Sequence, residues 1–331
     1  MQNIIKGYMK QAKVGRKQSY KNMAVYPLLS TYDIALEYSF LDEALEEALV
    51  EVVEVDQGGD VPELKVINKS EQMILIIDGE ELVGAKQNRI VNTTILVPGN
   101  STIVIPVSCV EQGRWSYDTP RFYSEKRVMS ANMRANKAEQ VHASLRQSED
   151  FRSDQGAIWD EVAAKAMRRG AESPSMAMAA IYEKDRPSIQ EYTKQFRLID
   201  SQVGAVFLIN GKVVGLDSFG KPESFSKIHK KLVESYALDA VDWFDPKKEV
   251  KTLRSEVTKF LKASQTTQVE SRPSVGLGND CRLESKKLSG FALSLDGQIL
   301  HMSIFAKANG RNRFKQASRM ERYSRRRQER I

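Results

Sequence analysis

Three Asx-Gly dipeptides, each set between two apolar runs, constrain the fold of this 331-residue chain more than any other feature. They lie in MILIIDGEELVGA (73–85), AVFLINGKVVGLD (205–217) and GFALSLDGQILHMSIF (290–305). Asn-Gly and Asp-Gly favour hairpin turns because both residues tolerate positive φ. A fourth strand pair is predicted on either side of the turn PGNS, in RIVNTTILVP and STIVIPVSCV. We therefore expect several antiparallel hairpins that form one or two sheets.

Helical segments separate these hairpins. Helix-end residues, apolar spacing or the lack of Gly and Pro predict helices at 130–147, 154–170, 222–241 and 249–264. In 40–55 a helical pattern changes to alternation with a period of two, which predicts a helix that leads into a strand. Clusters of strands with helical blocks between them predict the α+β class, with a helical middle segment and helices packed on the sheet.

The two ends of the chain differ from its centre. Residues 1–20 are basic without a clear period, and we expect a loosely held lead-in there, followed by a single domain over 21–306 and an Arg-rich tail at 307–331. Residues 311–331 hold nine Lys or Arg and two Glu, so they carry the whole formal charge of +7. Such a tail can bind nucleic acid through counterion release, or it can serve as a solubilising segment.

Composition excludes several other classes. No run of about 18 apolar residues is present, so we expect no membrane contact, and the N-terminus lacks the apolar stretch of a secretory signal. The two cysteines, Cys109 and Cys281, form no disulfide framework, which favours a cytoplasmic location. None of the three histidines is spaced as part of a metal-binding pair, so no metal site is predicted, and no particular cofactor is indicated.

The stretch SCVEQGRW (108–115) ends an apolar strand with three functional side chains. Alternation along a strand over 102–110 would place one apolar row and a carboxylate on the same face, namely Ile103, Ile105, Val107, Cys109 and Glu111. Partial burial at the rim of the core would raise the pKa of Glu111, as a catalytic acid or base requires. The alternative is a salt bridge from Glu111 to Arg114 that closes the turn at Gly113.

A second polar stretch, GEELVGAKQNR (79–89), lies between two predicted strands. Its polar side chains include those of Glu81, Lys86, Gln87, Asn88 and Arg89. Lys, Gln, Asn and Arg together can hold a phosphate or a sugar through several hydrogen-bond donors. An ordinary polar strand edge is the alternative interpretation.

Three further residues are candidates with weaker signals. Arg282 follows Gly276 and Gly278, where a glycine-rich turn can present backbone N–H groups to an anion, although a simple tight turn explains the same residues. Asp217 is expected at a strand end, where functional groups are often placed. His301 lies on an apolar strand face, where a histidine is more often a hydrogen-bonded core residue.

Several of these blocks together resemble a known family. YKNMAVYPL, VPELKVINKSEQMILIIDGEELVGAKQNRIVNTTILVPGNSTIVIPVSCVEQGRW, RSDQGAIWDEV, SYALDAV and SVGLGNDCRLE…GFALSLDGQILHMSIF are similar to the ARG and rhodanese-phosphatase-superfamily-associated protein domain, where ARG stands for ADP-ribosylglycohydrolase. The resemblance extends over about residues 20–306. It implies an association with ADP-ribose-processing enzymes in bacterial conflict and NAD-derived metabolism, without a settled activity.

The resemblance also marks polar positions: Glu81, Lys86, Gln87, Asn88, Arg89, Glu111, Arg114, Trp115, Gln155, Asp217, Arg282 and His301. On this basis we expect the domain to bind an ADP-ribose-like nucleotide, and hydrolysis of this nucleotide is the activity that the same residues would support. Arg114 and Arg282 would hold the pyrophosphate and Trp115 would stack on adenine.

The remaining roles in this hypothesis follow from residue type. Glu111, Asp217 and His301 would be the catalytic groups, with Glu111 as general base or as acceptor of a ribose hydroxyl, and His301 as acid or orienting partner. The remaining ribose contacts would come from Gln87, Asn88 and Gln155. Two alternatives remain open from the sequence alone. One is a non-catalytic interaction module, of the kind associated with immunity, whose tail (311–331) binds nucleic acid. The other is a scaffold in which these polar motifs only join hairpins.

Overall fold

The computed structural model describes residues 2–56, 61–308 and 311–312. The helices are α1 (Gln2–Gln11), α2 (Leu41–Glu46), α3 (Ala131–Gln147), α4 (Gln155–Arg169), α5 (Ala179–Thr193), α6 (Pro222–Asp242) and α7 (Arg254–Gln265). The first strands are β1 (Lys13–Val14), β2 (Gln18–Tyr20), β3 (Met23–Leu29), β4 (Tyr38–Phe40), β5 (Val50–Glu54), β6 (Glu63–Asn68), β7 (Met73–Ile76), β8 (Glu80–Gly84), β9 (Arg89–Val91), β10 (Ile95–Val97), β11 (Ser101–Cys109) and β12 (Phe122–Val128). The later strands are β13 (Gln202–Ile209), β14 (Lys212–Phe219), β15 (Gln268–Pro273), β16 (Asn279–Glu284), β17 (Leu288–Leu295), β18 (Gln298–Ala308) and β19 (Arg311–Asn312).

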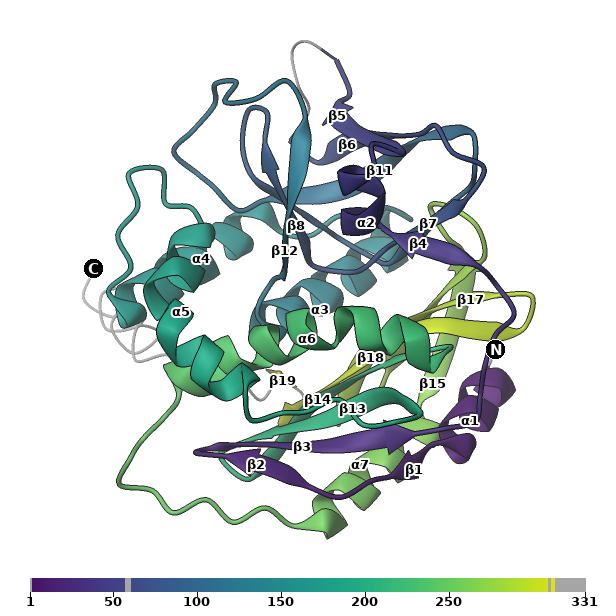
Figure 1. The fold of residues 1–331 in the computed structure, drawn as a ribbon, viewed down its shortest axis with the longest axis vertical. Coiled ribbons are helices and arrows are strands. Elements are labelled where there is room, and N and C mark those ends of the chain that lie inside the picture. The colour runs from purple at the N-terminus through teal and green to yellow at the C-terminus, as the bar shows by residue number, and fades with distance from the viewer. Residues whose placement is uncertain (1, 57–60, 309–310, 313–331) are drawn as a thin grey trace.

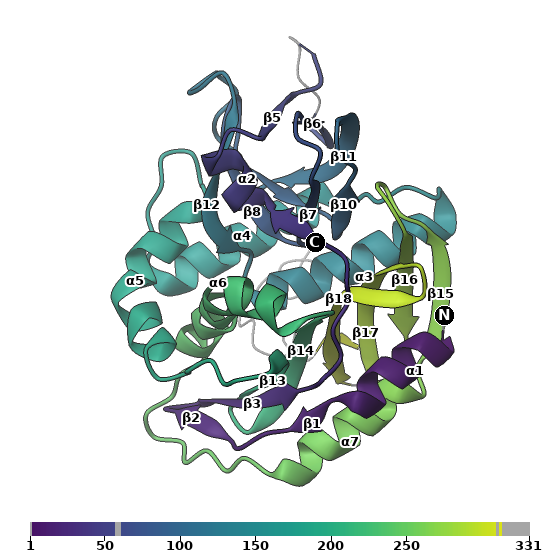
Figure 2. The ribbon, with the colours of Figure 1, turned by 45° about the vertical axis from the view of Figure 1, so that its right-hand side comes forward.

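A large antiparallel sheet forms one part of the molecule. Its strand order is β1-β3-β13-β14-β18-β17-β16-β15, with β2 added on β3 and β19 on β18. Helices α3 and α6 lie against one face, and α1 and α7 lie side by side against the other (Figures 1 and 2). Both faces of the sheet are therefore buried, which explains why all eight residues of β13 are buried, without polar alternation.

Two smaller sheets lie on the far side of α3 and α6 from the large sheet (Figure 1). One has the order β10-β7-β4, and the other has the order β12-β8-β9-β11-β6-β5. The six-stranded sheet curls so that its two end strands, β5 and β12, come into contact. An ion pair between Arg121 and Glu51, at 2.7 Å, joins these ends. The α+β class is confirmed.

The predicted helices are confirmed with small shifts of their ends. Asp154 caps α4 by accepting the Ala157 N–H at 3.0 Å, and Gly170 ends this helix with φ of 62°. Pro222 begins α6. The segment 40–55 forms α2 followed by β5, as the change of period predicts.

Two of the three Asx-Gly hairpins are confirmed. The turns Asn210–Gly211 and Asp296–Gly297 join β13 to β14 and β17 to β18, and all four residues have positive φ. The third prediction was wrong about pairing, because β7 pairs with β4 and β10 whereas β8 pairs with β9 and β12. Of the two residues in that turn, Asp78 and Gly79, Gly79 alone has a positive φ. The chain passes there from one sheet into another.

The pair predicted around PGNS was wrong in a similar way. RIVNTTILVP contains two strands, β9 and β10, which belong to different sheets. β11 pairs with β9 at one end and with β6 at the other. A turn motif constrains local backbone conformation, but it does not determine which strand lies alongside.

The prediction of a loosely held lead-in was also wrong for residues 2–20. Helix α1 packs on α7 and on the large sheet, with Ile5, Tyr8 and Met9 buried. At the other end, the described strands continue to Asn312, beyond the predicted domain end at 306. The predicted tail function concerns 311–331, of which 313–331 lie outside the described residues. Across the described part of the chain, no helix is both long and apolar enough to span a bilayer.

Candidate functional site

The turn between β8 and β9 and the end of β11 lie together, and they contain most of the predicted residues. Burial along β11 alternates as predicted from Ser101 to Val107, but Ser108 is buried as well as Cys109. Glu111 follows a bend at Val110 and is also buried. Its carboxylate Oε2 accepts the backbone N–H of Asn88 at 3.1 Å, so the two segments are joined directly.

Arg114 completes this connection. Its Nε and Nη2 donate to Glu111 Oε2 at 3.0 and 2.7 Å, and Nη2 also donates to Asn88 Oδ1 at 3.0 Å. Its Nη1 donates to the carbonyl of Ala85 at 2.6 Å. The salt bridge that the sequence offered as an alternative is therefore present. Because the guanidinium is engaged on all three nitrogens, its donors are used within the protein.

The expected rise in the pKa of Glu111 is wrong. Burial alone would raise this pKa, but hydrogen bonds from Arg114, from Ser175 Oγ at 2.6 Å and from the Asn88 N–H outweigh it and lower the pKa. Each donor stabilises the carboxylate form. The carboxylate therefore fits a positioning role, holding the two segments in place, better than a proton donor's role.

Four side chains beside this turn form a surface that we call the aromatic–cation cluster: Lys86, Arg89, Trp115 and Tyr117. Lys86 Nζ lies 5.3 Å from the Trp115 ring centroid and 5.2 Å from the Tyr117 ring centroid. The Arg89 guanidinium lies 5.7 Å from the Trp115 centroid. Trp115 and Tyr117 are 49% and 53% exposed, whereas Arg89 is fully buried. Two accessible rings therefore cover two cations.

The buried part of this cluster contains unpaired polar atoms. Arg89 Nη1 donates to Gln87 Oε1 at 3.2 Å, but Nε and Nη2 have no acceptor among the described residues. Burial lowers the pKa of Arg89. Glu54, at the end of β5, accepts the Lys86 N–H at 3.3 Å through Oε1, while its Oε2 has no partner among those same residues. Unpaired buried groups of this kind each cost about 1–3 kcal/mol and call for an explanation.

Gln87 and Gln155 both contact Cys109, the last residue of β11. The Gln155 amide pairs with the backbone of Cys109 in both directions, accepting its N–H at 2.7 Å and donating to its carbonyl at 2.8 Å. The Cys109 thiol lies 3.1 Å from Gln87 Oε1, and burial raises the pKa of this thiol. A buried thiol with a raised pKa is a poor nucleophile.

Asp217 and His301 lie elsewhere, in a buried ion network between the large sheet and α3. We define this network as Asp78, Arg134, Lys137, Asp217 and His301. Arg134 Nη2 donates to Asp217 Oδ1 at 2.7 Å, and His301 Nε2 is 3.8 Å from the same oxygen. Burial would raise the pKa of Asp217, but Arg134 and His301 lower it well below its usual range. Burial lowers the pKa of His301, which favours the neutral ring.

The other half of the network ties α3 to the small sheets. Asp78 pairs with both Arg134 and Lys137, and the Lys137 ammonium also donates to the carbonyls of Val91 and Asn92 at 3.0 Å each. Burial lowers the pKa of Lys137 to about 8. Asp217 lies within β14 rather than at its end, and both it and His301 are fully buried. The core interpretation of His301 therefore agrees with its surroundings.

Arg282 is buried in a third environment. Its Nε and Nη2 donate to Asp280 at 2.6 and 2.8 Å, and Nη2 also donates to Thr93 Oγ1 at 2.9 Å. The rings of Phe151 and Phe291 lie 5.7 and 5.4 Å from the guanidinium carbon. These contacts enclose the guanidinium between a carboxylate and two aromatic rings.

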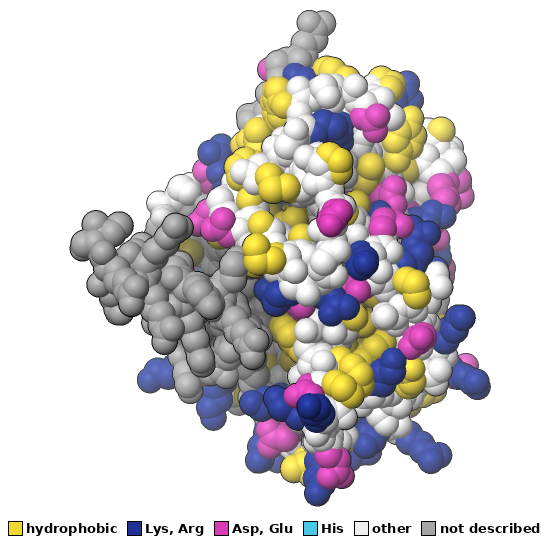
Figure 3. All heavy atoms as spheres, turned by 90° about the vertical axis from the view of Figure 1, so that its left-hand side faces the viewer, with side chains coloured by type: hydrophobic (Ala, Val, Ile, Leu, Met, Phe, Trp, Pro, Cys, Tyr) yellow, Lys and Arg dark blue, Asp and Glu magenta, His cyan; other side chains and the backbone are white. Residues whose placement is uncertain are grey.

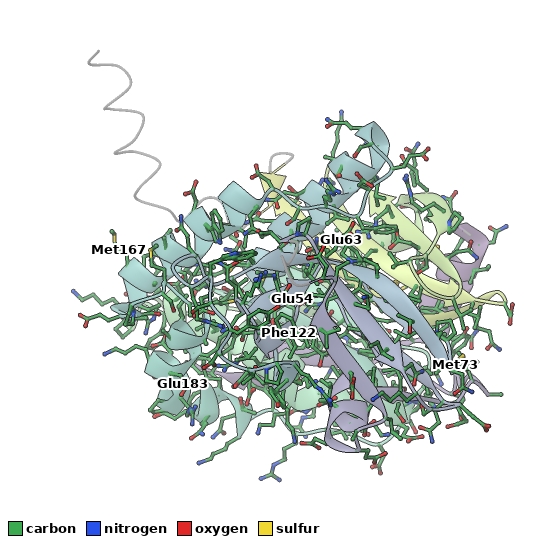
Figure 4. The ribbon with its side chains drawn as sticks, turned by 90° about the horizontal axis from the view of Figure 1, so that it is seen from above. Glu54, Glu63, Met73, Phe122, Met167 and Glu183 are labelled. Atoms are coloured by element: carbon green, nitrogen blue, oxygen red, sulfur yellow. The ribbon has the colours of Figure 1, made fainter. Side chains whose placement is uncertain are left out.

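Glu81 lies behind a surface cleft of about 220 Å³ between β12, α5 and α6. Arg127, which lines this cleft with Tyr182 and Glu183, has its Nε 2.9 Å from Glu81 Oε2, although without hydrogen-bond alignment. Burial raises the pKa of Glu81 to about 7, against the opposing charge of Arg127. Figure 4 places Glu183 well apart from Glu54, so the cleft and the aromatic–cation cluster are separate.

Most of the chain matches a known protein family. Residues 11–305 match the family described as the ARG and Rhodanese-Phosphatase-superfamily-associated Protein domain. The chain belongs to this family. A search of curated proteins and a search of solved structures each found no match.

The residues that resemble the signature of this family therefore fall into separate groups. One group surrounds the β8–β9 turn and contains Lys86, Gln87, Asn88, Arg89, Glu111, Arg114, Trp115 and Gln155. Asp217 and His301 are in the buried ion network, Arg282 pairs with Asp280, and Glu81 pairs with Arg127. The described residues therefore do not bring all of these side chains into a single pocket.

Sequence reasoning missed Glu54, Tyr117 and Arg134. Glu54 had a signal, because it lies on the apolar face of the alternating run VEVVEV, as Glu111 does in its own strand. Tyr117 lies two residues from Trp115 in an irregular segment, where no pattern marks it. Arg134 lies in a predicted helix whose sequence shows no reason for a buried cation.

Glu81 predicts a pH-dependent stability of the domain. Its folded pKa of about 7 lies above the ordinary value of 4.5, so the folded protein holds this proton more tightly than the unfolded chain does. The contribution to stability is fully present below about pH 4.5 and is lost as the pH rises through about 7. We expect the free energy of unfolding to fall by about 3 kcal/mol over this interval.

Urea denaturation at about pH 5 and about pH 8 measures this effect. The isosteric Glu81→Gln variant removes the titrating group and should lose most of the difference. If wild type and Glu81→Gln show the same pH dependence, the assignment to Glu81 is wrong.

Proposed function

We propose that the aromatic–cation cluster binds a nucleotide of the ADP-ribose type, derived from NAD. The observation that carries this proposal is the Arg89 guanidinium, which is fully buried beneath the half-exposed Trp115 ring with two unpaired nitrogens among the described residues. A phosphate oxygen is the acceptor that a guanidinium fork fits best. Lys86, held between Trp115 and Tyr117, adds a second charge beside it.

The exposed aromatic rings support a ligand with a planar base. A nucleobase that stacks on an aromatic side chain gains about 1–3 kcal/mol. Trp115 and Tyr117 offer two such rings within reach of the same ammonium group. The resemblance to a family associated with ADP-ribose-processing enzymes supports the choice of an adenine nucleotide with a pyrophosphate.

This proposal changes the roles that the sequence suggested. Arg114 and Arg282 were expected to hold the pyrophosphate, but both donate to carboxylates of the protein itself. Arg89 and Lys86 take this role, and Trp115 keeps its predicted place on the base. Glu111 positions the β8–β9 turn through the Asn88 N–H. Hydrolysis by Glu111, Asp217 and His301 stays a prediction.

Titration calorimetry of the full-length protein with ADP-ribose, NAD and ADP tests the proposal. We expect heat of binding with ADP-ribose, and a much weaker signal with adenosine, which lacks the phosphates that Arg89 and Lys86 would hold. A chromatographic assay of the same mixtures reports any cleavage. Absence of binding heat with all three nucleotides, from protein that is folded by circular dichroism, overturns the proposal.

A second candidate function rests on the charge of the tail. Residues 311–331 carry a net charge of +7 while the rest of the chain is neutral. On the face that Figure 3 shows, Lys and Arg side chains are mixed with Asp and Glu. Binding of RNA or DNA would then depend on the tail and weaken steeply with salt. Deletion of 311–331 should abolish a gel shift that the full chain gives at low salt, and a full chain that gives no shift excludes this function.

A further inference from the structure

Two buried carboxylates lie beside the aromatic–cation cluster, and they differ in how their oxygens are used. Glu111 Oε2 accepts from Arg114 and from the Asn88 N–H, and its Oε1 accepts from Ser175. Glu54 Oε1 accepts the Lys86 N–H, but no donor among the described residues reaches its Oε2. Glu111 is therefore satisfied by the protein, whereas Glu54 retains an unused acceptor.

Glu54 reaches this place because the six-stranded sheet curls. It is the last residue of β5, one end strand of that sheet, and it contacts the turn between the inner strands β8 and β9. Figure 4 shows Glu54 near Phe122 of β12, the opposite end strand. Buried and partly exposed residues alternate along β5, and Glu54 lies on the same buried face as Val50 and Val52.

An unused acceptor and unused donors thus lie at the same turn between β8 and β9. The charge of Glu54 acts on the Arg89 guanidinium, whose Nε and Nη2 are the unpaired donors. A phosphate bound to Arg89 would leave the Glu54 acceptor unpaired, because an ionised phosphate oxygen has no proton to donate. A hydroxyl group donates, so a ribose hydroxyl beside the bound phosphate can satisfy the Glu54 carboxylate.

We infer that Glu54 accepts hydrogen bonds from ribose hydroxyls and makes this site select nucleotides that carry a free vicinal diol. The inference rests on the proposed function and adds the group that determines specificity. A site built to bond a hydroxyl rejects an analogue that lacks it, because its own buried groups are then left unpaired. Glu54 acts by contact with the ligand, whereas Glu111 acts by holding the turn.

Access to these groups passes the Trp115 ring, which covers Arg89. Trp115 lies in the irregular segment between β11 and β12, where most side chains from Gln112 to Arg121 are exposed. A turn of this one side chain away from Arg89 would open the donors and present the indole face to a base. Binding would then exchange the contact between indole and guanidinium for contacts with the ligand.

Calorimetry with ADP-ribose, ADP and 2′,3′-dideoxy-ADP tests the inference on the full-length protein. If the adenosine ribose is recognised, wild type should bind ADP at least about tenfold more tightly than the dideoxy compound. If the terminal ribose is recognised, the same difference should separate ADP-ribose from ADP. The isosteric Glu54→Gln variant should lose whichever preference wild type shows, while its affinity for the weaker ligand stays the same.

The matched control is Glu51→Gln on the same strand, whose carboxylate pairs with Lys69 and Arg121 rather than with the cluster. It should keep the preference of wild type. Equal affinities of wild type for all three compounds, or a preference that survives in Glu54→Gln, overturns the inference while leaving nucleotide binding intact. Failure of every compound to bind overturns the proposed function and this inference with it.

Discussion

Replacement of Asp217 by Ala is expected to lower the free energy of unfolding by about 3–5 kcal/mol, because it removes the closest counter-charge of a buried guanidinium. Arg134 donates to both Asp217 oxygens, at 2.7 and 3.2 Å. Tyr236 Oη and Ser303 Oγ also donate to this carboxylate, at 2.9 and 2.5 Å, and would lose their acceptor. Urea denaturation followed by tryptophan fluorescence measures the change.

Two further variants separate this cause from a general effect of substitution. Glu191→Ala breaks an exposed pair with Lys21 and should change the stability little, since surface ion pairs are screened by solvent. The double variant Asp217→Leu with Arg134→Met removes both charges and should recover much of the loss. If Asp217→Ala is as stable as wild type, the buried ion network does not stabilise the fold as we describe.

Replacement of Trp115 by Ala should weaken the binding of ADP-ribose by about 10- to 100-fold, the loss expected when a base no longer stacks on an aromatic ring. The ring is half exposed and lies beyond the hydrophobic cores, so the stability of the domain should change little. Calorimetry gives the affinity, and thermal denaturation of the same samples shows whether the fold is kept.

Tyr123→Ala is the matched control for this prediction. Tyr123 is also a large exposed aromatic residue, 55% accessible, but it lies on β12 outside the aromatic–cation cluster. Its removal should leave the affinity for ADP-ribose unchanged. Equal losses in the two variants would mean that exposed aromatic residues contribute without forming a defined site, and no loss in Trp115→Ala would contradict stacking on Trp115.

Local features of the sequence predicted local features of the structure well. The turns at Asn210–Gly211 and Asp296–Gly297 form the expected hairpins because a two-residue turn with positive φ at both positions leaves its flanking strands paired. At Asp78–Gly79 the same dipeptide leads into a different sheet. There the Asp78 side chain bonds Arg134 and Lys137, which lie 56 and 59 positions away in the sequence.

For the predicted site residues too, the sequence predicted local features but not the contacts with distant segments. Alternation predicted a partly buried Glu111, and Glu111 is buried, but Ser108, Cys109 and Val110 before it are all buried too, so the alternation itself ends at Val107. The direction of its pKa shift was wrong, because hydrogen bonds from the neighbouring Arg114, from Ser175, 64 positions away, and from the Asn88 N–H together outweigh burial. Asp217 and His301 were expected near the other polar motifs, but the packing of α3 on the sheet placed Arg134 between two carboxylates and buried them.

By itself, the sequence determined five of the seven described helices, most of the strands and the α+β class, since these depend on near neighbours and on residue period. Helices α1 and α5 were not predicted. Only the tertiary structure decided that both carboxylate oxygens of Glu111 accept hydrogen bonds, whereas one oxygen of Glu54 has no donor among the described residues. Glu54 and Glu111 both follow apolar rows, yet the curl of the six-stranded sheet brings Glu54 to the Lys86 N–H of the β8–β9 turn, while Arg114, Ser175 and Asn88 surround Glu111. Hydrogen-bond partners come from distant segments, and the pattern of a single strand contains no information about them.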